Sequence, residues 1–196
     1  TRRSSDLYMR VLGIDPGTAI VGIGIVDYVD KKMKLVHYDC IYTHKDEQMN
    51  NRIMSIYEQL NKIIDIYKPD AVAIEELFYF KNNKTVISVS QARGVMLLAA
   101  TQRGLNISEY TPLQIKMGIT GYGRAEKKQV QIMVQKLLGL SEIPKPDDAA
   151  DALAICITHI NSSNSLLSSV RNLKVDTKSI KSNKLTAKEY RDLFSK

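Results

Sequence analysis

Cysteine, histidine and long apolar runs are all scarce in this sequence, and each scarcity argues against a class of protein. The 196 residues include two cysteines, Cys40 and Cys156, each in an apolar segment and without the spacing of a zinc site or a disulfide framework. No apolar run approaches the ~20 residues that a membrane-spanning helix needs, and no apolar secretory signal is present. We therefore expect a cytoplasmic protein that does not associate with membranes.

The remaining composition is typical of a globular domain, with 44% hydrophobic and 25% charged residues. The length suits one α/β domain with a tail. The net charge is +7, but residues 171–196 contribute +5 of it and the residues before them only +2. A basic tail is more often a solvated appendage than a surface that reads nucleic acid, so the overall charge is weak support for a polyanionic partner.

A local group of basic residues is more informative than the net charge. Between residues 116 and 136 five cations are opposed nearby only by Glu126; they are Lys116, Arg124, Lys127, Lys128 and Lys136. A phosphate backbone selects this pattern. The alternative is a solvated helix face.

Hydrophobic periodicity predicts a single α/β domain with a mixed sheet. Three strands come first with no helix between them, and a turn near residues 30–32 joins the second to the third, which implies an antiparallel start. The predicted strands span residues 10–15, 19–27, 33–42, 70–76 and 106–110. The predicted helices span residues 46–66, 86–103, 125–138 and 147–160, with Asp147 as the N-cap of the last, and a short helix begins at Thr111-Pro112.

Acidic residues stand where several of these apolar elements meet their loops. A carboxylate at the end of a core strand is costly to bury unless it is paired or holds a cation, so Asp15 is either a metal ligand or a turn-capping residue. Because successive strand residues face opposite ways, only one of Glu75 and Glu76 can join Asp15. Positions three apart share one face of a helix, so Asp148 and Asp151 can point at one cation.

Carboxylates that converge in this way repel one another, and divalent ions would relieve the repulsion. Oxygen ligands with no matching histidine or cysteine pattern favour magnesium or manganese over zinc. Two such ions clamp the attacking and leaving oxygens of an in-line phosphoryl displacement. The alternative is that Asp148 and Asp151 are only favourable charges in the first turn of their helix.

Five stretches, in order along residues 9–160, resemble the bacterial RuvC Holliday-junction resolvases. They are Ile14-Asp15-Pro16-Gly17-Thr18, Ile74-Glu75-Glu76-Leu77-Phe78, Gln91-Ala92-Arg93-Gly94, Ala125-Glu126-Lys127-Lys128-Gln129-Val130 and Asp148-Ala149-Ala150-Asp151-Ala152-Leu153-Ala154. The resemblance implies an RNase H-like fold over residues 9–162, with a mixed central sheet flanked by helices. Residues 163–196 then form a basic Ser/Asn/Lys-rich tail, and residues 1–8 are a cloning remnant or a ragged extension.

The same resemblance implies a homodimer that nicks two symmetry-related strands of a four-way DNA junction, after branch migration by RuvA and RuvB. It implies metal ligands at Asp15, Glu75, Asp148 and Asp151, with two Mg²⁺ ions per site and Mn²⁺ as a substitute. Lys116 and Lys127 correspond to basic residues at the scissile phosphate, and Phe78 to an aromatic side chain beside unpaired bases. Lys81 and Arg93 are candidates for backbone contacts, and Arg124 and Lys128 belong to the basic group that would bind DNA.

The predicted activity is a structure-selective endonuclease that hydrolyses phosphodiesters with two metal ions. Three alternatives are a junction-binding module with weak or no catalysis, an RNase H-like nuclease that acts on RNA, and an ATP phosphotransferase of the actin and sugar-kinase type. The last shares the Asp15-Pro16-Gly17-Thr18 pattern but needs a second domain, for which this chain is too short. His159, two turns beyond Asp151, is a further candidate for a position near the site.

Overall fold

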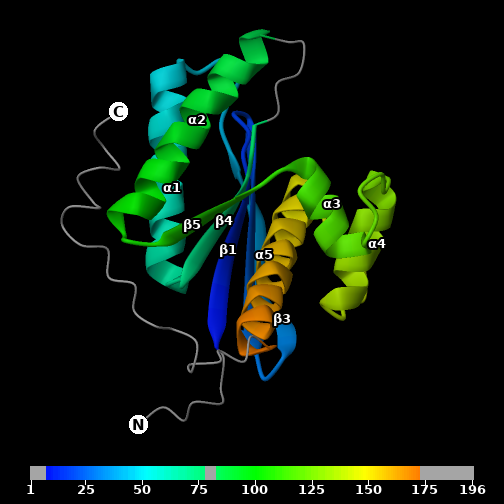
Figure 1. Cartoon of the computed structure of the whole chain (residues 1–196). Helices are drawn as coiled ribbons and strands as arrows, with labels where there is room; N and C mark the ends of the chain where they lie inside the picture. Colours follow the sequence, from blue (N-terminus) through cyan, green and yellow to red (C-terminus); the bar gives the residue numbers. More distant parts are fainter. Residues whose placement is uncertain (1–7, 78–82, 173–196) are drawn as a thin grey trace, which may run out of the picture. The chain divides into compact units, whose positions relative to one another are not determined.

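A five-stranded mixed sheet forms the centre of the computed structural model, which describes residues 8–77 and 83–172 (Figure 1). The strands are β1 (Met9–Asp15), β2 (Ile20–Val29), β3 (Lys32–Tyr42), β4 (Ala71–Glu75) and β5 (Asn106–Tyr110), in the spatial order β3-β2-β1-β4-β5. β2 pairs antiparallel with β1 and with β3, whereas β4 is parallel to both β1 and β5. The predicted antiparallel start with parallel additions is confirmed.

Helices cover both faces of the sheet. α1 (Met49–Tyr67) and α2 (Asn83–Gln102) lie on one face; α5 (Asp147–Asn172) lies on the other, with α3 (Pro112–Thr120) and α4 (Lys127–Leu137) beside it (Figure 1). The chain divides into two compact units, residues 1–164 and 165–196, and the site lies in the first. Among the described residues, no helix is both long and apolar enough to cross a membrane.

The prediction for the last helix was right about its start at residue 147 but wrong about its end and its N-cap. α5 continues to Asn172 instead of ending near residue 160. Asp147 lies in its first turn, and the carbonyl of Pro146 accepts the first helical hydrogen bonds, from the N–H groups of Ala149 and Ala150. Asp147 is therefore free of the N-cap role, and its carboxylate is directed to other partners.

Glycines in β1 and β2 let α5 lie directly on the sheet. A Cβ atom on Gly13 would stand 2.2 Å from the carbonyl oxygen of Ala152, and one on Gly22 would stand 2.0 Å from the carbonyl oxygen of Asp148. Both distances are far inside van der Waals contact, so only glycine admits the helix backbone here. This close approach brings the first turns of α5 to the end of β1.

Two local sequence signals fix the starts of the helices that carry the predicted lysines. Thr111 caps α3 through a reciprocal pair of hydrogen bonds with Gln114, and Glu126 forms the equivalent capping box with Gln129 at the start of α4. α3 thus begins immediately after β5, as predicted, and α4 begins at Lys127. The caps bring Lys116 and Lys127 into the neighbourhood of the strand ends.

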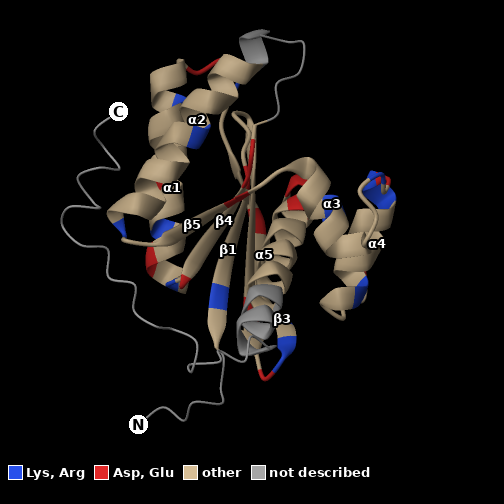
Figure 2. Cartoon of the chain, in the orientation of Figure 1, with Lys and Arg blue, Asp and Glu red and all other residues tan. Residues whose placement is uncertain are grey.

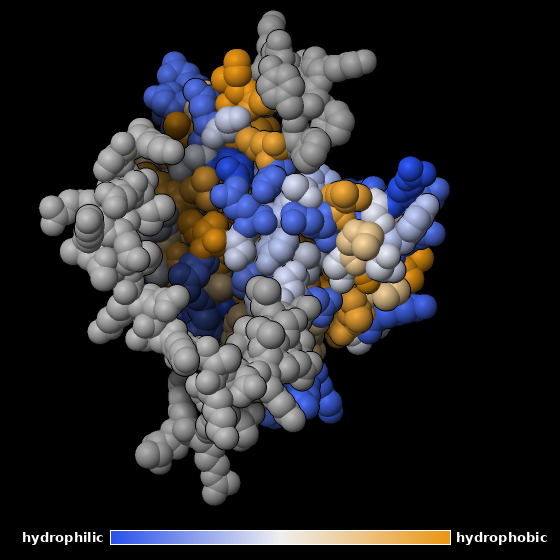
Figure 3. Space-filling view, in the orientation of Figure 1, coloured by the Kyte–Doolittle hydropathy of each residue, from blue (hydrophilic) through white to orange (hydrophobic). Residues whose placement is uncertain are grey.

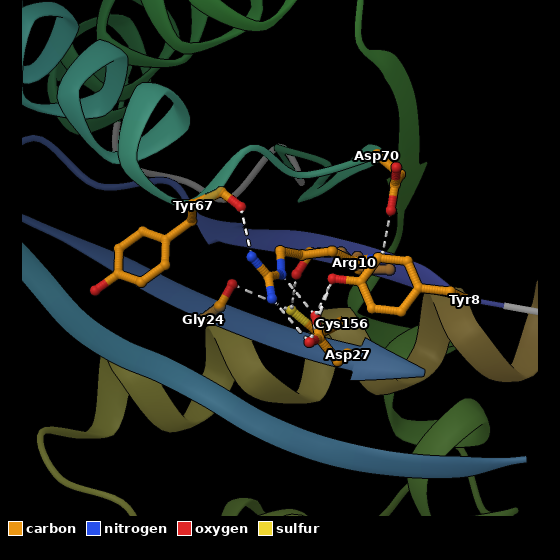
Figure 4. Close-up of polar contacts among 8 residues, drawn as sticks. Tyr8, Arg10, Gly24, Asp27, Tyr67, Asp70 and Cys156 are labelled. Atoms are coloured by element: carbon orange, nitrogen blue, oxygen red, sulfur yellow. Dashed lines mark hydrogen bonds and ion pairs between the residues drawn. The ribbon is translucent and has the colours of Figure 1, made fainter. Parts of the chain in front are cut away.

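The opposite end of β1 is closed by a polar cluster around Arg10 (Figure 4). The guanidinium donates to both carboxylate oxygens of Asp27, at 2.7 and 2.9 Å, and to the carbonyl oxygen of Tyr67 at 2.8 Å. The backbone N–H of Arg10 donates to Asp70 at 2.7 Å. β1, β2 and the end of α1 are therefore held together by charge-assisted hydrogen bonds.

Candidate active site

Acidic positions lie close together where β1 and β4 end and α5 begins (Figure 2), and Asp15 interacts there with the charges of Glu75, Asp148 and Asp151. Leu12 and Ile14 face the core under α1 and α2, so the alternation along β1 turns Asp15 toward α5. Ile14 pairs with Ile74 in the parallel ladder, which places Asp15 beside Glu75. The predicted choice between Glu75 and Glu76 is thereby made, because Glu75 is the one that interacts with Asp15.

The carboxylates at this convergence repel one another and are partly buried. Burial, followed by the negative charges of Glu75, Asp151 and Asp148, raises the pKa of Asp15 from 3.8 to about 8. Burial and the charge of Asp151 also raise the pKa of Glu75, although a hydrogen bond from Asp15 and the charge of Lys127 oppose the rise. At neutral pH Asp15 is therefore largely a protonated acid that donates to Glu75, and a bound cation would favour ionisation of the group.

Lys127 supplies the nearest positive charge. Its Nζ lies 2.9 Å from Oδ2 of Asp151 and 3.4 Å from Oδ2 of Asp147. Burial alone would lower the pKa of Lys127, but the bonds and charges of Asp151 and Asp147 outweigh it and raise the pKa. The lysine is consequently held as an ammonium between two carboxylates of α5.

A cavity of about 270 Å³ opens beside the carboxylates. Both predicted lysines and two of the four acids line it together with apolar side chains; the lining residues are Glu75, Pro112, Ile115, Lys116, Lys127, Val130, Asp151 and Ala154. Lysines in a hollow next to acids suit an anionic group that approaches a bound cation. The arrangement is that of a site for a phosphate ester.

The comparisons with known proteins decide the family. A family model described as crossover junction endodeoxyribonuclease RuvC matches residues 11–159, most of the chain. The chain belongs to the RuvC family. Membership makes it an endodeoxyribonuclease, as the resemblance implied, and excludes the phosphotransferase alternative.

Individual relatives agree with the RuvC assignment. A crossover junction endodeoxyribonuclease RuvC of Fusobacterium nucleatum is 60% identical over 190 residues, which cover 96% of this chain and all of the relative. Thermus thermophilus RuvC superposes with a TM-score of 0.74 at 35% identity, over 80% of this chain and 96% of that chain. The same protein in complex with a Holliday junction substrate gives 0.73 at 34%, with the same coverage. The predicted RNase H-like fold is confirmed.

The other residues predicted for a RuvC site are placed less uniformly. Arg124 and Lys128 are exposed around the start of α4, close in sequence to Lys127. Phe78 and Lys81 fall outside the described residues. His159 is buried, its Nδ1 lies 2.9 Å from the hydroxyl of Tyr110, and burial lowers its pKa, so its polar partner is a tyrosine of β5.

Arg93 has partners within the protein. Its guanidinium pairs with Glu109 on β5 and donates from Nε to the carbonyl oxygen of Glu75 at 3.3 Å, with 15% of the side chain exposed. Those bonds tie α2 to the ends of β4 and β5. The predicted contact of Arg93 with the DNA backbone stays a prediction.

The donor set fits a divalent cation by its chemistry, because all four side chains offer carboxylate oxygens. Among the described residues, no three Asp, Glu, His or Cys side chains are set so that they could hold a metal ion. The reason is visible in the pairing: Asp15 is bonded to Glu75, and Lys127 is bonded to Asp151. Four carboxylates that repel one another would accept a hard cation once those two pairings open.

Two contributors to the site escaped the sequence analysis. Gln131 is buried on α4 and donates from Nε2 to Oδ1 of Asp147 at 2.9 Å. The only signal for it was a polar residue next to Val130 in the apolar stripe of that helix. Gly13 and Gly22 lie within the predicted strands, but nothing in their spacing shows that a helix backbone lies on them.

Proposed function

We propose that this RuvC-family protein resolves four-way DNA junctions by paired symmetric nicks, using divalent metal ions to hydrolyse one phosphodiester in each of two strands. The observation that carries the proposal is the convergence of Asp15, Glu75, Asp148 and Asp151 beside a cavity with two lysines. The superposition on T. thermophilus RuvC, which was solved with a Holliday junction substrate, supports the choice of DNA. A DNA substrate also implies a cytoplasmic location.

The four carboxylates would hold two Mg²⁺ ions, with Mn²⁺ as a substitute. Bound there, the ions would supply Lewis acidity and a nucleophile at neutral pH, and would stabilise the attacking and leaving oxygens. The protein's own part is to deliver ionised oxygens from three separate elements to one point. Asp15 and Glu75 come from adjacent parallel strands, whereas Asp148 and Asp151 come from one face of α5.

The basic residues would bind and stabilise the phosphate. Lys116 and Lys127 line the cavity, so their ammonium groups are available to balance charge that develops on the scissile phosphate. Arg124 and Lys128 are exposed beside them and would contact the neighbouring backbone. Phe78 and Lys81 keep their predicted roles in base stacking and backbone contact on the strength of the resemblance alone.

Paired nicks require two copies of the site, and α1 and α2 offer a surface for a homodimer. A shallow pocket of about 240 Å³ lies between them, lined by Asn50, Ile53, Met54, Tyr57, Val95 and Leu98. Met54 and Leu98 are 57% and 49% exposed, and hydrophobic side chains gather over α2 in Figure 3. Cooperation with RuvA and RuvB is proposed from the family resemblance.

The test is cleavage of a supercoiled plasmid that extrudes a cruciform, with Mg²⁺, alongside the same plasmid without the repeat. Two incisions in one binding event give linear product, whereas a single incision gives nicked circles. We expect linear product from the cruciform only, and its loss in Asp15→Asn with junction binding retained. Tight binding without cleavage in Mg²⁺ or Mn²⁺ would instead favour a binding module, and nicked circles alone would contradict the dimer.

A further inference from the structure

We infer that Asp147, fixed by Gln131, is a positioning residue that keeps the Lys127 ammonium at the site when Asp151 binds a metal ion. The inference rests on the proposed function, because it takes Asp151 as a ligand. It assigns a role to an acid that lies outside the predicted ligand set.

The contacts form a short network between α4 and α5. Lys127 bridges Asp147 and Asp151, which are one helical turn apart, at 3.4 and 2.9 Å. Gln131, one turn after Lys127 on α4, donates to Oδ1 of Asp147, whereas Lys127 lies against Oδ2. The two oxygens of one carboxylate therefore serve two different partners, and neither partner displaces the other.

Burial divides this network of contacts into a fixed part and an adjustable part. Gln131 is only 6% exposed, and a buried amide must keep its hydrogen-bond partner, so the bond to Asp147 sets the direction of that carboxylate. The side chains of Lys127 and Asp147 are 54% and 62% exposed, which leaves the lysine room to shift between its two partners. A lysine that loses Asp151 to a cation still has a fixed acid beside it.

Without this second partner, the lysine has only Asp151 to pair with. Asp147→Asn should therefore strengthen the competition between Lys127 and the metal ion for Asp151, and should leave the ammonium unanchored once the ion has bound. We expect weaker binding of Mn²⁺ and slower single-turnover cleavage at saturating metal, each by about tenfold, as for other residues that orient a metal ligand. Gln131→Met, which removes the amide but keeps the bulk, should reproduce part of both effects.

The experiment is a double-mutant cycle on the full chain, with two readouts. Mn²⁺ binding is titrated calorimetrically without DNA, and single-turnover cleavage of a four-way junction is measured with saturating metal. Asp147→Asn is compared in the natural sequence and in a Lys127→Met background, with Glu76→Gln as the control for loss of one nearby negative charge. The expected result is that Asp147→Asn weakens Mn²⁺ binding in the natural sequence but not beside Lys127→Met.

Each other outcome has its own meaning. A Mn²⁺ effect of Asp147→Asn that persists with Lys127→Met, or that Glu76→Gln matches, would show a general charge effect and overturn the inference. Natural protein and Asp147→Asn that bind Mn²⁺ and cleave equally well would overturn it too. Natural protein that binds no Mn²⁺ would instead contradict the proposed metal site. Thermal unfolding of each variant, monitored by circular dichroism, checks that the exposed substitution leaves the fold intact.

Discussion

The two ends of β1 show opposite uses of charge in one strand. At the Arg10 end, a guanidinium meets the carboxylate of Asp27 through two short hydrogen bonds, and further acceptors surround it (Figure 4). At the Asp15 end, carboxylates from β1, β4 and α5 face one another, and Lys127 is the cation in contact with them. The Arg10 end holds a complete ion pair, whereas the Asp15 end holds an excess of negative charge.

The difference separates a structural cluster from a functional one. Hydrogen bonding to Asp27 raises the pKa of Arg10, so the fold favours the charged form of that residue. Burial and repulsion raise the pKa of Asp15 to about 8, so the fold disfavours its charged form. Strongly perturbed acids in a cleft mark a candidate ligand site, because a bound cation would offset the repulsion between them. We expect matched substitutions at the two ends to have opposite effects on stability.

The largest effect is expected from Asp15→Asn on cleavage. The amide keeps the shape but removes a charged oxygen donor, so we expect the rate of junction cleavage to fall by about a thousandfold or more. Single-turnover cleavage of a radiolabelled junction in Mg²⁺ measures the change. Asp70→Asn, at the Arg10 end, is the control and should cleave at the natural rate. A variant Asp15→Asn that still cleaves within a factor of ten would remove Asp15 from the catalytic set.

The stability of the metal-free protein should depend on pH through Asp15. Its pKa is about 8 in the fold and near 3.8 when the chain is unfolded, so between those values the folded state binds a proton that the unfolded state has released. The stability contributed by this proton is complete below pH 4 and is lost as pH rises toward 8. Asp15→Asn lacks this loss and should melt several degrees above the natural protein at pH 8.5 but not at pH 4.5.

Thermal unfolding with EDTA, at several pH values for both proteins, measures this difference. Magnesium should remove it for the natural protein at pH 8.5 by binding the ionised carboxylates. Parallel melting temperatures for the two proteins across the whole range would show that Asp15 ionises as easily in the fold as outside it.

At the other end of β1, the same substitution should destabilise. Asp27→Asn removes the charge that two hydrogen bonds from Arg10 require and leaves a half-buried guanidinium underpaired. We expect a loss of about 2 kcal/mol in the free energy of unfolding, measured by urea denaturation at pH 7. Asp46→Asn is the matched control, because Asp46 is an exposed acid whose ion pair is with the exposed His44. An unchanged urea midpoint for Asp27→Asn would show that the Arg10 cluster does not contribute to the stability of the fold.

Much of this comparison could be predicted from the sequence. The strand and helix periodicities placed acids at the ends of two predicted strands and put Asp148 and Asp151 on one face of a helix. The family resemblance then implied that Asp15, Glu75, Asp148 and Asp151 form one ligand set. The capping signal at Thr111-Pro112 placed α3 correctly.

The rest depended on contacts between elements far apart in the chain. Nothing local tells that Lys127 pairs with Asp151, or that Gln131 reaches Asp147, because both depend on the angle at which α4 meets α5. The rotation of α2 about its axis decides whether Arg93 faces solvent or Glu109, and periodicity gave no sign of it. The family resemblance suggested a DNA contact for Arg93, and the pairing with Glu109 adds a structural role that the sequence did not predict.

The smallest effect is expected from Arg93, which helps to hold the Asp15 end of the sheet in place. It ties α2 to the Glu75 carbonyl and to Glu109, so Arg93→Ala should let the end of β4 shift without removing any proposed ligand. We expect cleavage to slow by about tenfold, with a raised Mg²⁺ requirement and an unchanged dissociation constant for the junction. Glu109→Ala should give a similar loss, and the double variant should be no worse than either, because the two residues act as one unit.

If Arg93 contacts the DNA backbone instead, Arg93→Ala should weaken junction binding and flatten its dependence on salt, while Glu109→Ala leaves binding unchanged. Electrophoretic mobility shifts at two salt concentrations, beside cleavage at graded Mg²⁺, therefore decide whether Arg93 supports the site from behind or holds the substrate in front.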